Sequence, residues 1–340
     1  MAALQKAQAG KKRKNNVTSF IYFQEESLFR LQQELVEKTY RPGPYTTFYI
    51  YDKKKRMISA APFRDRVVHH ALCRVIEPIF EAGFIEDSYA NRKKKGTHWA
   101  VNRCSEFSRE NKYVLKFDIK KYFPSIDHAI LKTLIRQKIS DQDTLWLIDL
   151  IIDHSNTQEP VLDYFGGDDL FTPTKRRKGL PLGNQTSQFF ANIYLDALDH
   201  YVKDGLQCRY YIRYVDDGLV FENDKKQLWN IGKQIGDYLS TLRLRIHPNK
   251  YNVMPVRNGV LFLGYRVFPT HKLLPKSNTH GFKRKLRLFQ KLYAREILHI
   301  SDIRPSIHGW LGHALQANTY RIRRRIFSSF VLVKKPKISC

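Results

Sequence analysis

Three aspartates stand at positions where a carboxylate is costly unless it binds something. Asp216 and Asp217 lie between the β-rich segments 210–215 and 219–221, and Asp118 ends another apolar, β-rich segment. An acidic pair followed by glycine is also a common hairpin turn, so this pair alone leaves turn formation and chemistry equally open. A carboxylate at the end of a buried strand, however, needs a partner. Together the three could hold two divalent ions about 3.5–4 Å apart, an arrangement that activates a hydroxyl and neutralises phosphates.

The composition supports this interpretation. The 340 residues include 59 Lys and Arg against 32 Asp and Glu, a formal charge of +27. Such a field attracts polyanions, so nucleic acid is the leading expected partner and an anionic membrane the second. Oxygen-rich sites suit Mg²⁺, with Mn²⁺ as a possible substitute. A second acidic pair, Asp168–Asp169, follows two glycines in a polar stretch, and we expect it to be a solvated loop.

Other features favour a cytoplasmic protein without membrane segments. No apolar run approaches the roughly 20 residues that span a bilayer, and the N-terminus lacks a signal-peptide core. The four cysteines are scattered, which predicts neither disulfides nor a zinc site. His69, His70 and His98 lack metal-ligand spacing and are expected to be structural.

The elements that must position these aspartates follow from the apolar pattern, which predicts an α+β protein. We expect a solvated basic tail over 1–16, and a helix after Phe20 with an apolar stripe that includes Phe29 and Val36. A helix over 65–82 is expected to break near Pro78. The remaining expected elements are a hairpin with a basic tip over 48–60, a strand from 112 and a helix after 125. They continue with a helix over 187–202, the hairpin around Asp216, a helix over 226–242, a strand pair over 260–268 and a basic helical region over 276–340.

Four blocks in this order resemble the palm of reverse transcriptases. They are FDIKKYFPSID, GLPLGNQTSQFFANIYLD, RYVDDGLVF and FLGYRVF. The likeness extends over about residues 20–335 and implies the α+β fold of a right-hand polymerase. It implies fingers over 17–112, a palm with an antiparallel sheet over 113–270 with a finger insertion at about 150–180, and a helical thumb and tail over 271–340.

The block after Gly179 narrows the resemblance. LPLGNQTSQ is similar to the reverse transcriptases of diversity-generating retroelements, and differs from the corresponding motifs of group II intron and retron enzymes. Those enzymes copy a template RNA into cDNA with frequent errors opposite adenines. The expected partners are therefore the template RNA, the primer and cDNA strand, deoxynucleotide triphosphates, and a small basic oligomeric accessory variability protein.

The resemblance assigns roles residue by residue. Asp118, Asp216 and Asp217 match the metal-binding carboxylates, and the carbonyl of Ile119 matches the backbone ligand. Lys250 falls near the lysine proposed to protonate the leaving pyrophosphate.

The same resemblance outlines a substrate pocket. Phe123 matches the aromatic residue that excludes a ribose 2′-hydroxyl, and Lys54 and Arg56 match residues that hold the triphosphate. The remaining substrate-binding positions are Leu182, Gly183 and Gln188. Accurate relatives often carry glutamine where this chain has Leu182, so we hypothesise that leucine loosens nucleotide positioning. Simple packing by Leu182 is an equal alternative.

Other functions stay open. One is a reverse transcriptase of an intron-mobility or phage-defence system; the lack of an endonuclease or maturase segment after the expected thumb counts against the intron role. Another is a non-catalytic RNA-binding protein on a polymerase-like scaffold, which the intact aspartate set disfavours. A basic membrane-surface protein has no amphipathic anchor to support it.

Overall fold

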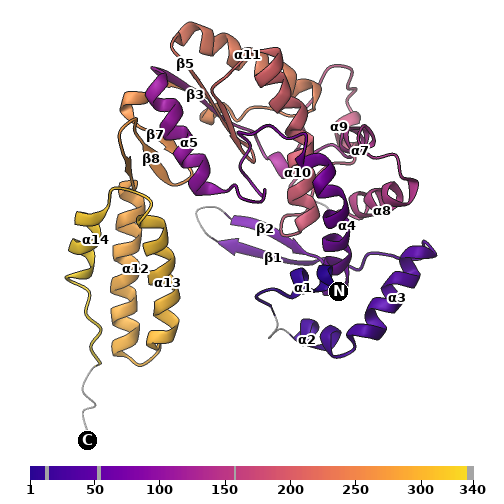
Figure 1. Ribbon diagram of the computed structural model, residues 1–340, viewed down its shortest axis with the longest axis horizontal. Helices are drawn as coiled ribbons and strands as arrows, with labels where there is room; N and C mark the ends of the chain where they lie inside the picture. The colour runs from indigo at the N-terminus through magenta and orange to yellow at the C-terminus, as the bar shows by residue number, and fades with distance from the viewer. Residues whose placement is uncertain (12–14, 52–54, 157, 335–340) are drawn as a thin grey trace, which may run out of the picture.

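A four-stranded antiparallel sheet occupies the centre of the protein (Figure 1). The computed structural model describes residues 1–340 except 12–14, 52–54, 157 and 335–340. The strand order is β4-β5-β3-β6. Its members are β3 (Tyr113–Asp118), β4 (Tyr211–Tyr214), β5 (Asp217–Glu222) and β6 (Asn252–Pro255). The strand predicted before Asp118 and the hairpin predicted around Asp216 are therefore confirmed.

Both faces of this sheet are covered, as the alternation of side chains requires. In β3, Leu115 and Phe117 join one core cluster, whereas Val114 joins a second cluster on the other side. Helices α10 (Gln185–His200) and α11 (Lys225–Thr241) belong to the first cluster, and α5 (Thr97–Glu110) belongs to the second. α10 is buried around most of its circumference rather than along the single face that its spacing indicated.

The N-terminal part differs from the expectation in two places. The segment expected as a solvated tail contains α1 (Ala2–Gln8), whose Leu4 and Ala7 are buried against α4 (Phe63–Glu81), so that expectation is wrong for these residues. Where one helix was expected, α2 (Asn15–Tyr22) and α3 (Gln24–Val36) follow each other. Phe29 and Val36 are 70% and 75% exposed, because the buried side of α3 is centred on Leu31 instead.

The predicted hairpin is confirmed as β1 (Thr46–Tyr51) and β2 (Lys55–Ala60), and residues 52–54 of its basic tip lie outside the described residues. α4 (Phe63–Glu81) continues through Pro78, so the predicted break is wrong. Pro78 lies in the last turn, where the helix already ends three residues later. The other helical elements in the first 250 residues are α6 (Tyr122–Ser125), α7 (His128–Arg136), α8 (Gln142–Asp153), α9 (Thr172–Lys175), η1 (Tyr201–Gly205) and η2 (Pro248–Lys250).

The C-terminal part is a three-helix bundle with a core of its own. It comprises α12 (Lys276–Ala294), α13 (Ile300–Ala314) and α14 (Tyr320–Phe327), and follows η3 (Val256–Asn258) and a small sheet of β7 (Val260–Phe262), β8 (Tyr265–Val267) and β9 (Lys272–Leu273). The basic region predicted to be helical does form helices, and Phe282, Leu286 and Phe289 of α12 are buried within the bundle. Among the described residues, no helix has both the length and the apolar composition needed to cross a bilayer.

Candidate active site

The register of the central sheet brings two of the predicted carboxylates together. Asp118 at the end of β3 lies directly opposite Asp217 at the start of β5. Side chains that face each other across antiparallel strands have Cβ atoms about 4.5–5.5 Å apart, and like charges at that separation destabilise a sheet. Asp216 precedes Asp217 in the hairpin turn. The strand pairing thus places Asp118 and Asp217 at one end of the sheet, with Asp216 in the adjoining turn.

The turn that carries Asp216 is tight and strained. Tyr214 pairs with Asp217, which leaves only Val215 and Asp216 to reverse the chain. Val215 has a φ of 56°, a left-handed conformation that β-branched residues rarely adopt and that costs on the order of 1–3 kcal/mol. Both turn carbonyls are held by hydrogen bonds, from Arg213 Nη1 to Val215 at 3.1 Å and from the Ile119 amide to Asp216 at 3.2 Å.

The close approach of β3 requires a glycine at position 218. It pairs with Phe117, whose ring lies across the glycine. A Cβ atom at Gly218 would lie 2.2 Å from the Cζ atom of Phe117. The glycine after the two aspartates therefore serves close packing of β3 on β5, which keeps Asp118 and Asp217 opposite each other.

The negative charges of the three carboxylates repel one another. Burial and the charges of Asp118 and Asp217 raise the pKa of Asp216 to about 6. Burial also raises the pKa of Asp217, although Lys116, whose Nζ lies 3.6 Å from Asp217 Oδ1, opposes that shift. Lys250 Nζ donates to Asp118 Oδ2 at 2.5 Å, so this predicted residue does lie at the site. Positive charge is thus favourable at each of the three aspartates.

The donor chemistry fits a hard divalent cation. The site offers carboxylate oxygens and the nearby backbone of Ile119, and oxygen is the donor that Mg²⁺ and Mn²⁺ prefer. Within the residues that the structure describes, no group of three or more His, Cys, Asp or Glu side chains, the three aspartates included, is placed to hold a metal ion by itself. Mg²⁺ commonly binds through one or two carboxylates and completes its coordination with substrate phosphates and water.

Several predicted substrate residues lie on or next to the loop before α10. The loop before α10 joins α6 to the β1–β2 hairpin, because Leu180 N donates to Phe123 O and Ser59 N donates to Leu182 O, both at 2.9 Å. Gly183 has a φ of 114°, and a Cβ atom there would lie 2.9 Å from Ile58 Cγ2. Phe123 and Leu182 are half-buried, while Gly183, Gln188 and Arg56 are exposed. Lys54 lies outside the described residues.

Sequence reasoning missed two polar groups that organise this region. Asn184 is buried and is tied to the end of β2: its Oδ1 accepts a hydrogen bond from Ala61 N at 3.1 Å, and its Nδ2 donates to Ser59 O at 3.0 Å. Arg213 is paired with Asp199 in the core below the turn. The available signal was an arginine inside an apolar strand and an acid inside an apolar helix.

The acidic pair Asp168–Asp169 is only partly the solvated loop that was expected. Asp169 is exposed and accepts a hydrogen bond from the Thr172 amide at the start of α9. Asp168 instead forms an ion pair with Arg176, and both side chains are buried. The expectation is therefore wrong for Asp168, which has a structural partner.

Comparison with known proteins decides the family. Residues 46–267 match the family described as reverse transcriptase (RNA-dependent DNA polymerase), which is more than half of the chain. The chain belongs to this family. This reverse transcriptase is an RNA-directed DNA polymerase, its substrates are a template RNA and nucleotides, and its family uses divalent metal ions. The predicted enzyme class is confirmed.

Relatives and solved structures agree with that conclusion. The reverse transcriptase is 25% identical to Protein YkfC of Escherichia coli (strain K12) over 78% of this chain and 76% of that protein. It is 29% identical to the group II intron-encoded protein LtrA of Lactococcus lactis subsp. cremoris, over 53% of this chain and 29% of LtrA. A telomerase from Candida tropicalis in complex with a telomeric RNA fragment superposes with a TM-score of 0.53 at 13% identity, over 89% of this chain and 58% of the telomerase. The right-hand polymerase fold is confirmed.

Proposed function

We propose that Asp118, Asp216 and Asp217 form the polymerase centre and hold two divalent ions, Mg²⁺ by preference and Mn²⁺ as a substitute, with the carbonyl of Ile119 as a further ligand. The main observation in support of this assignment is the register of β3 and β5, which places Asp118 opposite Asp217. Such ions lower the pKa of an attacking hydroxyl and neutralise charge on the transferring phosphate. The aspartates would fix the positions of these ions. Lys250, whose Nζ contacts Asp118, would give a proton to the leaving pyrophosphate.

The nucleotide pocket is proposed to lie between the aspartates and the β1–β2 hairpin. Phe123 would exclude a ribose 2′-hydroxyl by its ring, and Arg56, together with Lys54, would hold the triphosphate. Leu182, Gly183 and Gln188 would line the sugar and base. The hydrogen bonds from Leu180 to Phe123 and from Ser59 to Leu182 support this placement, since they fix the loop between the two groups.

The C-terminal bundle is proposed to be the thumb and to grip the primer–template backbone. A shallow groove along α12 is lined by Arg284, Lys285, Arg287 and Lys291 around the half-exposed Leu288. Phosphate contacts of this kind are independent of base sequence and weaken as salt is raised. The limits of fingers, palm and thumb stay predictions.

Primer extension on a defined RNA template tests the proposed centre. With deoxynucleotides and Mg²⁺ we expect DNA synthesis that EDTA abolishes and that excess Mg²⁺ restores, because the aspartates need a cation to bind substrate phosphates. Ribonucleotides should be incorporated poorly. Synthesis that persists in EDTA would contradict the proposal. Reactions that show no synthesis should be repeated with the native RNA and accessory protein. If no DNA is made with both present, that result would also contradict the proposal.

We also propose that the enzyme serves targeted gene diversification, with error-prone copying opposite template adenines and a small basic accessory protein as its partner. The motif LPLGNQTSQ and the leucine at position 182 support this role. Intron mobility is the alternative, which the similarity to LtrA favours. Phage defence, or RNA binding without catalysis, are further alternatives.

The variant Leu182→Gln tests the diversifying role. A glutamine amide can hydrogen-bond near the nucleotide sugar, and one such bond contributes about 0.5–1.5 kcal/mol. We expect misincorporation at template adenines to fall by roughly 2–10-fold, as read from sequenced cDNA. Leu182→Met is the matched control, because it changes shape without adding a donor, and its error rate should equal that of the wild type. An unchanged adenine error rate in the glutamine variant would refute the role of Leu182.

A further inference from the structure

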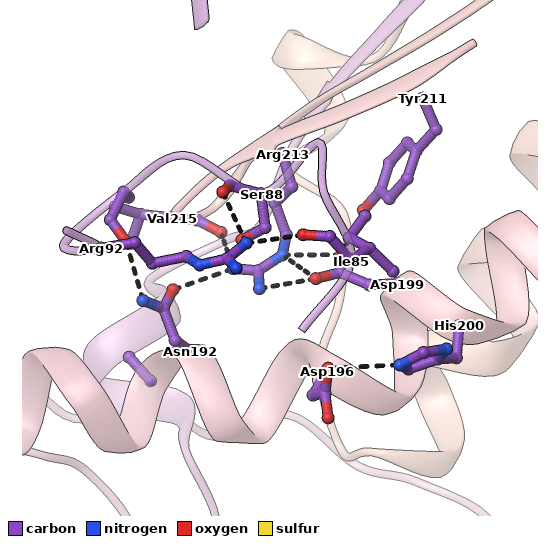
Figure 2. A network of polar contacts seen from close by, with 12 residues as sticks. Ile85, Ser88, Arg92, Asn192, Asp196, Asp199, His200, Tyr211, Arg213 and Val215 are labelled. Atoms are coloured by element: carbon purple, nitrogen blue, oxygen red, sulfur yellow. Dashed lines mark hydrogen bonds and ion pairs between the residues drawn. The ribbon is translucent and has the colours of Figure 1, made fainter. Parts of the chain in front are cut away.

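A buried ion pair contacts the turn that carries Asp216 (Figure 2). The side chains of Arg213 and Asp199 are 2% and 0% exposed. Arg213 Nε donates to Asp199 Oδ1 at 2.7 Å and Oδ2 at 2.9 Å, and Nη2 donates to Oδ2 at 2.7 Å. This two-oxygen geometry fixes the plane of the guanidinium.

The remaining nitrogen of Arg213 points away from the ion pair and toward the turn. Nη1 donates to the Val215 carbonyl at 3.1 Å and to Asn192 Oδ1 at 3.3 Å. The Asn192 amide is itself oriented, since its Nδ2 donates to Ala90 O at 2.8 Å. The Val215 carbonyl therefore faces a donor whose position is set by residues of α10.

Stability alone does not explain this arrangement. A buried ion pair is often no more stabilising than apolar side chains of similar volume. An apolar residue at position 213, however, could not donate to the carbonyl of Val215. That carbonyl belongs to a residue in the left-handed conformation, which persists only where the surroundings hold it.

We propose that Arg213 is a positioning residue for the polymerase reaction: it holds the strained Val215 peptide and so sets where the Asp216 carboxylate lies. Asp199 and Asn192 in turn orient Arg213. This inference rests on the proposed role of Asp216 at the polymerase centre. It adds a chain of contacts from α10 to the turn that neither the motif nor the family assignment supplies.

Arg213→Lys tests the proposal. Lysine keeps the charge opposite Asp199 but cannot donate to that carboxylate and to Val215 in the fork geometry of arginine. We expect the Mg²⁺ concentration at half-maximal activity to rise, and kcat to fall, by roughly 10–100-fold, with KM for primer–template unchanged. Tyr211→Phe is the matched control, because it removes a hydrogen bond to Asp199 at 2.9 Å and leaves the turn contact in place. It should lower Tm without moving the Mg²⁺ midpoint.

Repeating the test in the Val215→Gly variant separates an effect of Arg213 on the position of the turn from an effect on core stability. Glycine adopts positive φ freely, so in Val215→Gly the turn no longer depends on the arginine contact. We expect Arg213→Lys to cost several-fold less in this background than in the wild type. Equal losses in both backgrounds, or a lower Tm for Arg213→Lys with a wild-type Mg²⁺ midpoint, would overturn the proposal.

Two further variants keep the outcome interpretable. Asn192→Ala retains the ion pair but removes the contact with Arg213 Nη1, together with the hydrogen bond to Ala90 O. It should shift the Mg²⁺ midpoint in the same direction by a smaller factor. An unshifted midpoint counts against the proposal, including where Arg213→Lys does not fold. Asp216→Asn is assayed beside them. If that variant kept full activity, the proposed function itself would fail, whereas a dead Asp216→Asn with an unaffected Arg213→Lys would overturn only the positioning role.

Discussion

The Asp216→Asn variant is expected to lose RNA-templated primer extension by about 10³-fold or more, because an amide cannot replace a carboxylate at a centre that contributes several kcal/mol. The same variant is expected to fold more stably than the wild type in chelator at pH 7. Burial, with the charges of Asp118 and Asp217, raises the pKa of Asp216 from 3.8 to about 6. An amide removes that unfavourable charge.

The direction in which the free energy of unfolding changes with pH follows from the number of protons bound by the folded and the unfolded chain. Between about pH 4 and pH 6 the folded chain holds a proton on Asp216 that the unfolded chain has already released. The contribution of Asp216 to the free energy of unfolding is therefore fully favourable below pH 4 and is lost as the pH rises through 6. At pH 7 the stability gain of the variant is on the order of 1–3 kcal/mol, discounted for the partial exposure of the side chain.

Thermal melts in EDTA at pH 4 and pH 7, beside primer extension in Mg²⁺, measure both effects. Asp169→Asn is the matched control, because Asp169 is exposed on a loop and its amide variant should keep full activity. An Asp216→Asn enzyme that stays active, or that is less stable than the wild type at pH 7, would contradict the expectation.

Gly218→Ala is expected to destabilise the fold by about 3 kcal/mol or more and to abolish synthesis, since overpacking a core at such short range forces backbone movement. The new Cβ atom would lie 2.2 Å from the ring of Phe117, between the two strands that carry Asp118 and Asp217. Urea unfolding and primer extension on the same preparation measure the two effects.

Gly236→Ala supplies the matched control for this substitution. Gly236 lies in α11, and the nearest atom to a new Cβ would be Ile246 Cδ1 at 3.7 Å, an ordinary contact. Alanine in a helix is favoured over glycine by roughly 0.5–1 kcal/mol, so this variant should be as stable as the wild type or more so. Adding Phe117→Leu should restore part of the stability of Gly218→Ala. A Gly218→Ala protein with wild-type unfolding would show that β3 and β5 separate without cost.

Local patterns were sufficient to predict the strands and the meeting of the aspartates. The β-rich arms around Asp216 and the apolar run before Asp118 specify antiparallel neighbours, and the order of motifs specifies the polymerase fold. The apolar pattern could not predict which side of a helix packs against the rest of the protein. Phe29 and Val36 share one face of α3 by helical spacing yet both lie exposed, because contact with the rest of the chain, rather than periodicity, decides burial.

Long-range pairing was also beyond the sequence. Arg213 and Asp199 lie on different elements, and no spacing rule links an arginine in a strand to an acid on a helix. Asp168 was expected in solvent because two glycines precede it, but Arg176 lies close enough to bury the carboxylate. In both cases the pattern around the acid does not indicate the partner that makes its buried charge tolerable.

The separate core of the C-terminal bundle has a mechanical consequence. Phe282 stacks on Trp310 within the bundle, whereas the contact with the small sheet centres on Tyr265, whose hydroxyl donates to the carbonyl of His313 at 2.9 Å. Figure 1 shows the three helices standing beside the rest of the protein and joined to it next to β7 and β8. Because the bundle has an apolar core of its own and, among the described residues, joins the neighbouring core only around Trp310, Ala314 and Ala317, we expect it to rotate about this junction as a rigid lever. Such a movement would let the enzyme open around a duplex of changing length at little cost to either core.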